Sequence, residues 1–242
     1  MQVLYEDNHI IAISKTCHEI VQGDKTGDTP LSEQVKAYIK DKYNKPGEVF
    51  LGVTHRLDRP TTGVVLFART SKALTRLNAM FQSHEQIQKT YWAIVPANPQ
   101  LSLTNRLENY IWRNEKLNKS FVVKPGTKDA KRAVLSYKVI AQSERYMLLA
   151  INRETGRHHQ IRCQLAAIGC PIKGDLKYGA KRSNPDGGIS LHARKVEFIH
   201  PVSKQPICIT APVPDDTLWQ TLTKHIFSIF IFQQIRFDGV FD

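Results

Sequence analysis

One carboxylate, Asp58, stands among two arginines and a histidine in the segment 55–63, which reads His-Arg-Leu-Asp-Arg-Pro-Thr-Thr-Gly. Pro60 stiffens the chain there, and Gly63 permits backbone conformations that other residues resist. The apolar run 64–67 that follows is typical of a buried central strand. A rigid loop at the end of a core strand is a good place for a reacting group, so we expect Asp58 to be chemically active.

Two other interpretations of this segment must be weighed. An ion-paired turn without chemistry would also gather such residues, and the segment alone leaves that alternative open. Protein kinases carry His-Arg-Asp with an asparagine five residues after the aspartate. Here Leu57 separates Arg56 from Asp58, Gly63 takes the place of that asparagine, and the chain has no G-x-G-x-x-G and no Asp-Phe-Gly. We therefore exclude a kinase.

A second segment, residues 155–162, reads Thr-Gly-Arg-His-His-Gln-Ile-Arg. It opens a predicted helix over 158–168 whose apolar stripe consists of Ile161, Leu165 and Ile168. His158 and Arg162 are four residues apart and would share one helix face beside that stripe. An arginine at such a half-buried position needs an anionic partner, and Asp58 is the candidate. Adjacent histidines lack the spacing of a helical zinc pair, so we expect no metal.

The elements that must position these groups follow from hydrophobic periodicity. Strands are expected at 3–6, 10–14, 63–68, 90–95, 133–141, 146–152, 190–198 and 206–211. Helices are expected at 30–43 with Thr29 as cap, at 71–81 with Ser71 as cap, at 158–168, and at 215–224. Strands and helices do not alternate regularly, which predicts an α+β fold with a mixed, mainly antiparallel sheet.

The charge balance points to a polyanion as partner. The 242 residues include 34 Lys and Arg against 22 Asp and Glu, a formal charge of +12, and nucleic acid is the usual partner of such a surface. Residues 113–132 are the most basic stretch. We expect them to form a loop that contacts phosphates through Lys116, Lys119, Lys124 and Lys128, although a merely solvated loop would have the same composition.

Several function classes are disfavoured by what the sequence contains. The four cysteines, Cys17, Cys163, Cys170 and Cys208, form no C-x-x-C pair, so we expect reduced thiols and no zinc. We recognise no signal peptide and no apolar run of the ~18 residues that span a bilayer, and we expect a cytoplasmic protein without a membrane. We divide the chain into a catalytic domain, 1–224, and a hydrophobic tail, 225–242, that packs on it or at an interface.

Five ordered segments together resemble the RluA family of RNA pseudouridine synthases. They are 55–63, Lys-Thr-Tyr at 89–91, 155–162, Gly-Asp-Leu-Lys-Tyr-Gly at 174–179 and Leu-His-Ala at 191–193. The resemblance extends from Val3 to about Trp219. Thr62 stands where the family more often has serine, and Gln164 where many members have histidine. Since the first strand begins near Val3, we expect the S4-like domain of many members to be absent, which favours a compact RNA target.

The resemblance implies a role for individual residues. Asp58 matches the catalytic aspartate, Tyr91 the tyrosine that stacks on the target base, and Arg162 the arginine that pairs with the aspartate. Arg56 matches the arginine that fills the gap left by the flipped nucleotide. The remaining motif residues expected to contact RNA are His55, Arg59, Thr62, Lys89, Arg157, His159 and Gln160.

The implied reaction breaks N1–C1′ of uridine and forms C5–C1′ with the same base. Since no water attacks and the base reattaches, one carboxylate can suffice where a glycosidase needs two, and neither metal nor cofactor is required. Three routes stay open to Asp58: attack at C1′, attack at C6, or removal of the 2′ proton. The alternative function is a non-catalytic RNA-binding protein or RNA chaperone, which intact Asp58, Tyr91 and Arg162 disfavour. We expect a monomer that acts on ribosomal or transfer RNA.

Overall fold

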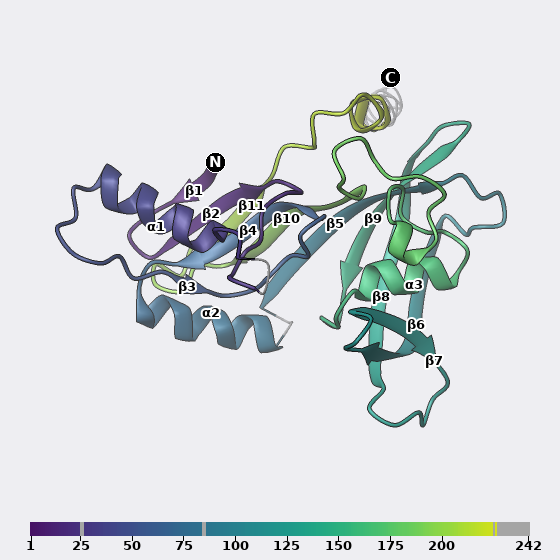
Figure 1. Cartoon of the computed structure of the whole chain (residues 1–242), viewed down its shortest axis with the longest axis horizontal. Helices are drawn as coiled ribbons and strands as arrows, with labels where there is room; N and C mark the ends of the chain where they lie inside the picture. Colours follow the sequence, from purple (N-terminus) through teal and green to yellow (C-terminus); the bar gives the residue numbers. More distant parts are fainter. Residues whose placement is uncertain (25–26, 84–85, 225, 227–242) are drawn as a thin grey trace, which may run out of the picture.

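The chain builds one mixed sheet, seen in the computed structural model of Figure 1, which describes residues 1–24, 27–83, 86–224 and 226. Its order is β1 (Gln2–Glu6), β2 (Ile10–Lys15), β4 (Thr62–Ala68), β10 (Leu191–Ile199), β5 (Ile87–Pro96), β9 (Tyr146–Arg153), β8 (Lys131–Gln142), β6 (Thr104–Asn114) and β7 (Lys119–Val123). Two further strands, β3 (Gly52–Val53) and β11 (Pro206–Thr210), pair with β4 and β10. Among these described strands only β4 and β10 pair in parallel, so the predicted α+β class is confirmed.

Helices cover both faces of the sheet, and β2 shows why. Successive side chains of a strand point to opposite faces. Ile11 and Ile13 pack in one core with α1 (Leu31–Lys42), whereas Ile10 and Ala12 pack in another core with α2 (Ser71–Ser83). The third helix, α3 (Gln160–Ala167), contributes Ile161 and Leu165 to the core that contains α1. The candidate site therefore lies on the face that α1 and α3 share.

The predicted helix starts need correction at three places. The first helix begins at Leu31 after Pro30, and no side chain caps it, so Thr29 is not the cap. The cap of α2 is Thr70, whose hydroxyl oxygen accepts from the Ala73 amide at 3.2 Å, one residue before the predicted Ser71. The third helix begins at Gln160, because His159 adopts a left-handed conformation with φ 50°. His158 thus precedes the helix and shares no helix face with Arg162.

Three strands were not predicted: the two-residue β3, and β6 and β7. The segment 113–132, expected as a loop, contains the end of β6, all of β7 and the start of β8. β6 and β7 form an antiparallel hairpin in which Ile111 pairs with Val122 and Asn114 with Lys119. Their alternation of polar and apolar residues is weak because the hairpin, which lies at one edge of the sheet, has few buried positions.

The C-terminal helix covers residues 217–224, and Asp216 caps it by accepting from the amides of Leu218 and Trp219. Ile226 packs against the core formed around Trp219 and Leu222. The rest of the hydrophobic tail lies outside the described residues, so the predicted boundary at 224 and the packing of the tail stay predictions.

Gly63 is required where β4 meets β10. Its φ is +114°, a region that residues with a side chain rarely adopt. A Cβ at this position would lie 2.6 Å from the Ala193 nitrogen and still closer to the Ala193 carbonyl oxygen. Since Ala193 pairs directly with Gly63 across the parallel strands, a side chain there would push the two strands apart next to the Asp58 loop.

We predict that Gly63→Ala lowers the free energy of unfolding by about 3 kcal/mol or more, the sum of backbone strain and overpacking. Urea denaturation of the purified protein measures this loss. Gly126→Ala is the matched control, because Gly126 also has a positive φ of +84° but open space around it. Equal losses in the two variants would contradict the importance of the close approach to Ala193.

Candidate active site

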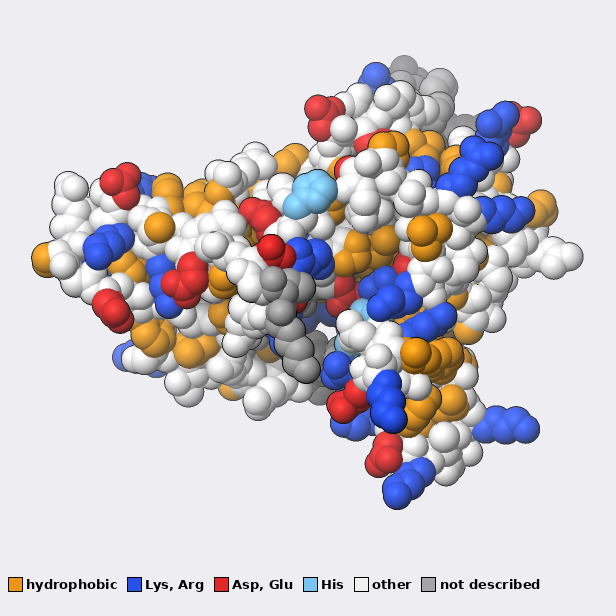
Figure 2. Space-filling view, in the orientation of Figure 1, with side chains coloured by type: hydrophobic (Ala, Val, Ile, Leu, Met, Phe, Trp, Pro, Cys, Tyr) orange, Lys and Arg blue, Asp and Glu red, His pale blue; other side chains and the backbone are white. Residues whose placement is uncertain are grey.

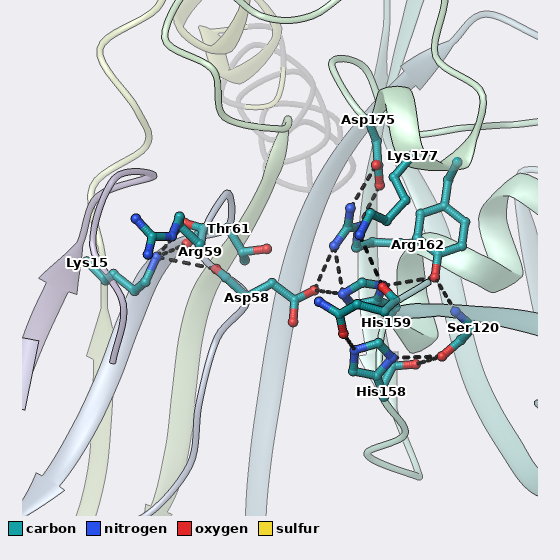
Figure 3. Close-up of polar contacts among 12 residues, drawn as sticks. Lys15, Asp58, Arg59, Thr61, Ser120, His158, His159, Arg162, Asp175 and Lys177 are labelled. Carbon is teal, nitrogen blue, oxygen red and sulfur yellow. Dashed lines mark hydrogen bonds and ion pairs between the residues drawn. The ribbon is translucent and has the colours of Figure 1, made fainter. Parts of the chain in front are cut away.

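Asp58 lies in the loop between β3 and β4, in a tight turn closed by the Thr61 amide, which donates to the Asp58 carbonyl oxygen at 3.0 Å. The Asp58 side chain is 31% exposed, so its carboxylate is within reach of a ligand. Figure 3 shows the carboxylate directed from this loop toward Arg162 of α3 and toward His159, the residue that precedes α3.

Lys15 stabilises this loop through hydrogen bonds to its backbone. Its side chain is almost fully buried, and Nζ donates to the carbonyl oxygens of Arg59 and Thr61 at 2.8 Å and of Asp58 at 3.3 Å. Burial lowers the pKa of Lys15 to about 8, even though the negative charge of Glu19 raises it. The sequence analysis missed Lys15, although a lysine at the end of the apolar strand 10–15 is a signal for a buried, partnered cation.

Arg162 joins two carboxylates. Its Nε donates to Asp175 Oδ2 at 2.6 Å and its Nη2 to Asp175 Oδ1 at 2.8 Å, a bidentate pair. Its Nη1 donates to Asp58 Oδ2 at 3.1 Å, so the predicted contact between Arg162 and Asp58 is present. The second carboxylate was not predicted as a partner, even though Asp175 stands in one of the five recognised segments. Asp175 is 1% exposed and fixes the plane of the guanidinium.

His159 completes the contacts around Asp58. Its Nε2 lies 3.0 Å from Arg162 Nη1 and 3.5 Å from Asp58 Oδ2, and its Nδ1 lies 2.9 Å from Tyr178 Oη. Burial lowers the pKa of His159 to about 3, so the ring is neutral at pH 7. Because Nε2 accepts from Arg162, the ring proton lies on Nδ1 and is donated to Tyr178. His159 is buried and orients Arg162, which is a different use from the RNA contact expected for it.

A short polar chain continues from this point to the β6–β7 hairpin. The Ser120 amide donates to Tyr178 Oη at 2.8 Å. His158 stacks on His159 at 3.8 Å, and its Nδ1 lies 2.8 Å from Ser120 Oγ. Figure 3 shows these groups as one continuous network from Ser120 to Asp58.

Tyr91 lies in β5, in one row with Ala193 of β10 and Gly63 of β4. Its ring is 4% exposed and belongs to the same core as Leu57, the neighbour of Asp58. Arg153 Nη2 donates to Tyr91 Oη at 2.8 Å, and the Arg153 guanidinium carbon lies 4.6 Å from the ring centre. Arg153 was not predicted, since only the pairing of β5 with β9 brings it to Tyr91.

Some motif residues serve the protein interior. His55 accepts from the Leu66 amide at 3.1 Å and stacks on Phe81 at 4.7 Å. Thr62 Oγ1 lies 2.8 Å from His192 Nδ1, which joins the first recognised segment to the last. These contacts stabilise the loop and strand around Asp58, and the RNA contacts expected of the two residues stay predictions.

Gln160 is 1% exposed, and both the oxygen and the nitrogen of its side-chain amide form hydrogen bonds. The oxygen accepts from Thr155 Oγ1 at 2.8 Å and from the Arg157 amide at 3.0 Å, and the nitrogen donates to the Val134 carbonyl at 3.0 Å. Gln160 thus shapes the turn before α3, and its expected contact with RNA stays a prediction. Arg157 itself is exposed and donates through Nε to the Arg132 carbonyl oxygen at 2.9 Å.

The exposed cations lie around this network. Arg56 is exposed beside the Asp58 loop, and Arg59 forms an ion pair with Asp28 at 2.7 Å. Figure 2 shows Lys and Arg side chains over the end of the molecule that carries β6 and β7. The predicted lysines there differ in exposure: Lys119 is half-buried over the Tyr178 ring at 5.2 Å, whereas three are exposed, namely Lys116, Lys124 and Lys128.

Within the described ranges, no group of three or more His, Cys, Asp or Glu side chains is arranged to hold a metal ion. Within the same ranges, no helix has the length and apolar composition needed to cross a bilayer.

Comparison with known proteins agrees with this geometry. The family model described as RNA pseudouridylate synthase matches residues 9–167. The chain is 32% identical over 229 residues to the ribosomal large subunit pseudouridine synthase D of Xanthomonas campestris pv. campestris, covering 89% of this chain and 67% of that one. It is 31% identical over 242 residues to the tRNA pseudouridine synthase C of Vibrio cholerae serotype O1, covering 92% and 94%. The structure of human RNA pseudouridylate synthase domain containing 4 shares the fold, with a TM-score of 0.73, 23% identity and 88% of each chain covered.

We predict that Arg162→Met lowers the free energy of unfolding by about 3–5 kcal/mol, because Asp175 is left as an unpaired buried charge. Urea denaturation measures this. The double variant Arg162→Met/Asp175→Asn should recover part of that stability, since no buried charge remains, while turnover stays low because nothing orients Asp58. Arg113→Met, which removes an exposed arginine, is the control and should change stability by less than about 0.5 kcal/mol. A stable, fully active Arg162→Met protein would contradict the bridging role.

Proposed function

Because the chain belongs to the RNA pseudouridylate synthase family, we propose that Asp58 is the carboxylate with which it isomerises uridine to pseudouridine in RNA. The observation that carries the proposal is the asymmetry of the Asp58 carboxylate. Arg162 donates to Oδ2, and none of the hydrogen bonds or ion pairs among the described residues involves Oδ1. One oxygen is therefore fixed to the protein and the other faces the substrate.

The reaction needs no more than such a group. The N1–C1′ bond breaks, the base turns, the C5–C1′ bond forms, the C5 proton leaves, and N1 takes up a proton, so the product is an isomer of the substrate. With Oδ2 held by a guanidinium, Oδ1 of Asp58 can attack C1′ or C6, or take the 2′ proton, and the bond is broken again when the base reattaches. The neutral ring of His159 adds no charge near this oxygen, so Arg162 provides the nearest positive charge.

Tyr91 is proposed as the residue against which the target base packs. Its hydroxyl is held by Arg153 and its ring lies in the core next to Leu57, so its orientation is fixed before substrate arrives. A preorganised aromatic ring recovers part of the few kcal/mol needed to turn a base out of its stack. Arg56, exposed beside Asp58, is proposed to fill the space that the base leaves.

The substrate is proposed to be a structured ribosomal or transfer RNA. The relatives with this level of identity include one enzyme named for ribosomal RNA and one named for transfer RNA. Because both kinds of RNA are found in the cytoplasm, we propose a cytoplasmic location. The exposed lysines near the β6–β7 hairpin support phosphate contacts there. A monomeric state stays a prediction. The alternative, an RNA chaperone without catalysis, gives no reason for a carboxylate held ready by a buried arginine.

We predict that Asp58→Asn lowers turnover by at least about 100-fold while RNA affinity stays near that of the wild type. Asparagine keeps the shape but is neither nucleophile nor base. Tritium release from RNA labelled at C5 of uridine measures turnover, and fluorescence anisotropy measures binding. Asp41→Asn, at an exposed position of α1, is the control. Turnover within about tenfold of the wild type would exclude Asp58 as the catalytic group.

We predict that the triple variant Lys116→Glu, Lys124→Glu, Lys128→Glu binds RNA more weakly and with a flatter salt dependence. Each lost phosphate contact changes the slope of log K against log salt by about 0.7–0.9. The control reverses three exposed lysines elsewhere, Lys40, Lys45 and Lys72. If both triple variants change the slope equally, the β6–β7 region makes no specific contribution to RNA binding.

A further inference from the structure

Two positive side chains lie next to Tyr91 and take no part in the network around Asp58. Lys89 precedes Tyr91 by two positions in β5, and Arg153 ends the neighbouring strand β9. The antiparallel register pairs Thr90 with Asn152, so one step further along the strands Lys89 stands opposite Arg153. Both side chains are half-buried.

Among the described residues, no negatively charged side chain pairs with Lys89 or Arg153, and the nearest partners are aromatic rings. Lys89 Nζ lies 4.4 Å from the centre of the Phe81 ring, and the Arg153 guanidinium lies over Tyr91. The Arg153 Nε is buried without any hydrogen-bond acceptor.

The arrangement is costly for the protein alone. Like charges opposite each other in a sheet are destabilising, and a buried N–H group without an acceptor costs about 1–3 kcal/mol. Burial and then the charge of Arg153 lower the pKa of Lys89 to about 7. Cation–π contacts offset part of this cost, but they leave the donors of Lys89 and the Nε of Arg153 unused.

The pair also lies close to the reacting groups. Arg153 donates to the Tyr91 hydroxyl. Burial, and then the charges of Lys89 and Arg153, hold the pKa of His55, three residues before Asp58, well below its ordinary value. A ligand that bridges Lys89 and Arg153 would therefore lie beside the ring against which the target base is proposed to pack.

We propose that Lys89 and Arg153 form a subsite for one phosphate group of the RNA backbone adjacent to the target uridine. This rests on the proposed function, which brings a phosphodiester to each side of that nucleotide. A phosphate oxygen would accept from Lys89 Nζ, and a second from Arg153 Nε, which satisfies the unused donors and separates the two positive charges. Arginine and lysine are the side chains that bind phosphate best.

The first test uses sulfate as the probe. The melting temperature of the full chain is measured at pH 6.5, once in a few millimolar sulfate and once in chloride of the same ionic strength. At this concentration sulfate is too dilute to stabilise proteins in general. The wild type should melt higher in sulfate. Lys89→Met should melt higher than the wild type in chloride, because the repulsion is gone, and should no longer respond to sulfate. Arg153→Gln, which keeps a donor for Tyr91, should lose the response as well.

The matched control is Lys138→Met. Lys138 is an exposed residue of β8, and it points away from the sheet face on which Leu135 and Tyr137 are buried. It should retain the sulfate response.

The second test measures RNA binding. Lys89→Met should weaken it about tenfold, which corresponds to the loss of one charged hydrogen bond, and Lys138→Met should leave it unchanged. A sulfate response equal in all four proteins, or equal RNA affinities for the two lysine variants, would overturn the subsite. Tritium release by the wild type is scored separately, so a failure of the proposed function is distinguishable from a failure of this subsite.

Discussion

The active site depends on one guanidinium held between two carboxylates. Asp175 is buried and takes two hydrogen bonds from Arg162, which fixes the plane of the arginine, and the third hydrogen bond then reaches Asp58. A buried ion pair of this kind contributes little to stability on balance, because desolvation cancels most of the attraction. Its value here is geometric, since the buried carboxylate determines where the exposed one is held.

His159 shows how the backbone serves that geometry. Its left-handed conformation ends the preceding strand-to-helix connection and directs the ring toward Arg162, so α3 begins only at the next residue. The ring stays neutral and connects Arg162 to Tyr178, and Tyr178 connects to Ser120 of β7. The hairpin proposed to contact RNA and the carboxylate proposed to react are thus joined by three side chains, those of Arg162, His159 and Tyr178, and by the Ser120 amide.

The sequence predicted the fold class, most strands and the contact between Asp58 and Arg162, because apolar periodicity and recurrent motifs are local signals. It did not predict β6 and β7, whose charged, largely exposed residues carry a weak alternation. Nor did it indicate the partners Lys15, Asp175 and Arg153. The roles of Lys15 and Arg153 arise from strand order and register, and that of Asp175 from the turn that brings it back to Arg162 of α3. The expected helix face of His158 was wrong because one left-handed residue intervenes.

The pairing of β4 with β10 has a consequence for how the protein is made. Thr62 and His192, which it brings together, are 130 residues apart, and Asp58 and Arg162 are 104 residues apart. Contacts between such distant segments close long loops and form late in folding. On a translating ribosome, the Asp58 loop emerges after Lys15, which holds its backbone, but well before Arg162 and His192. A nascent chain can therefore assemble the sheet half that contains β1, β2 and β4, but it gains a working centre only after almost all of the polypeptide has been synthesised.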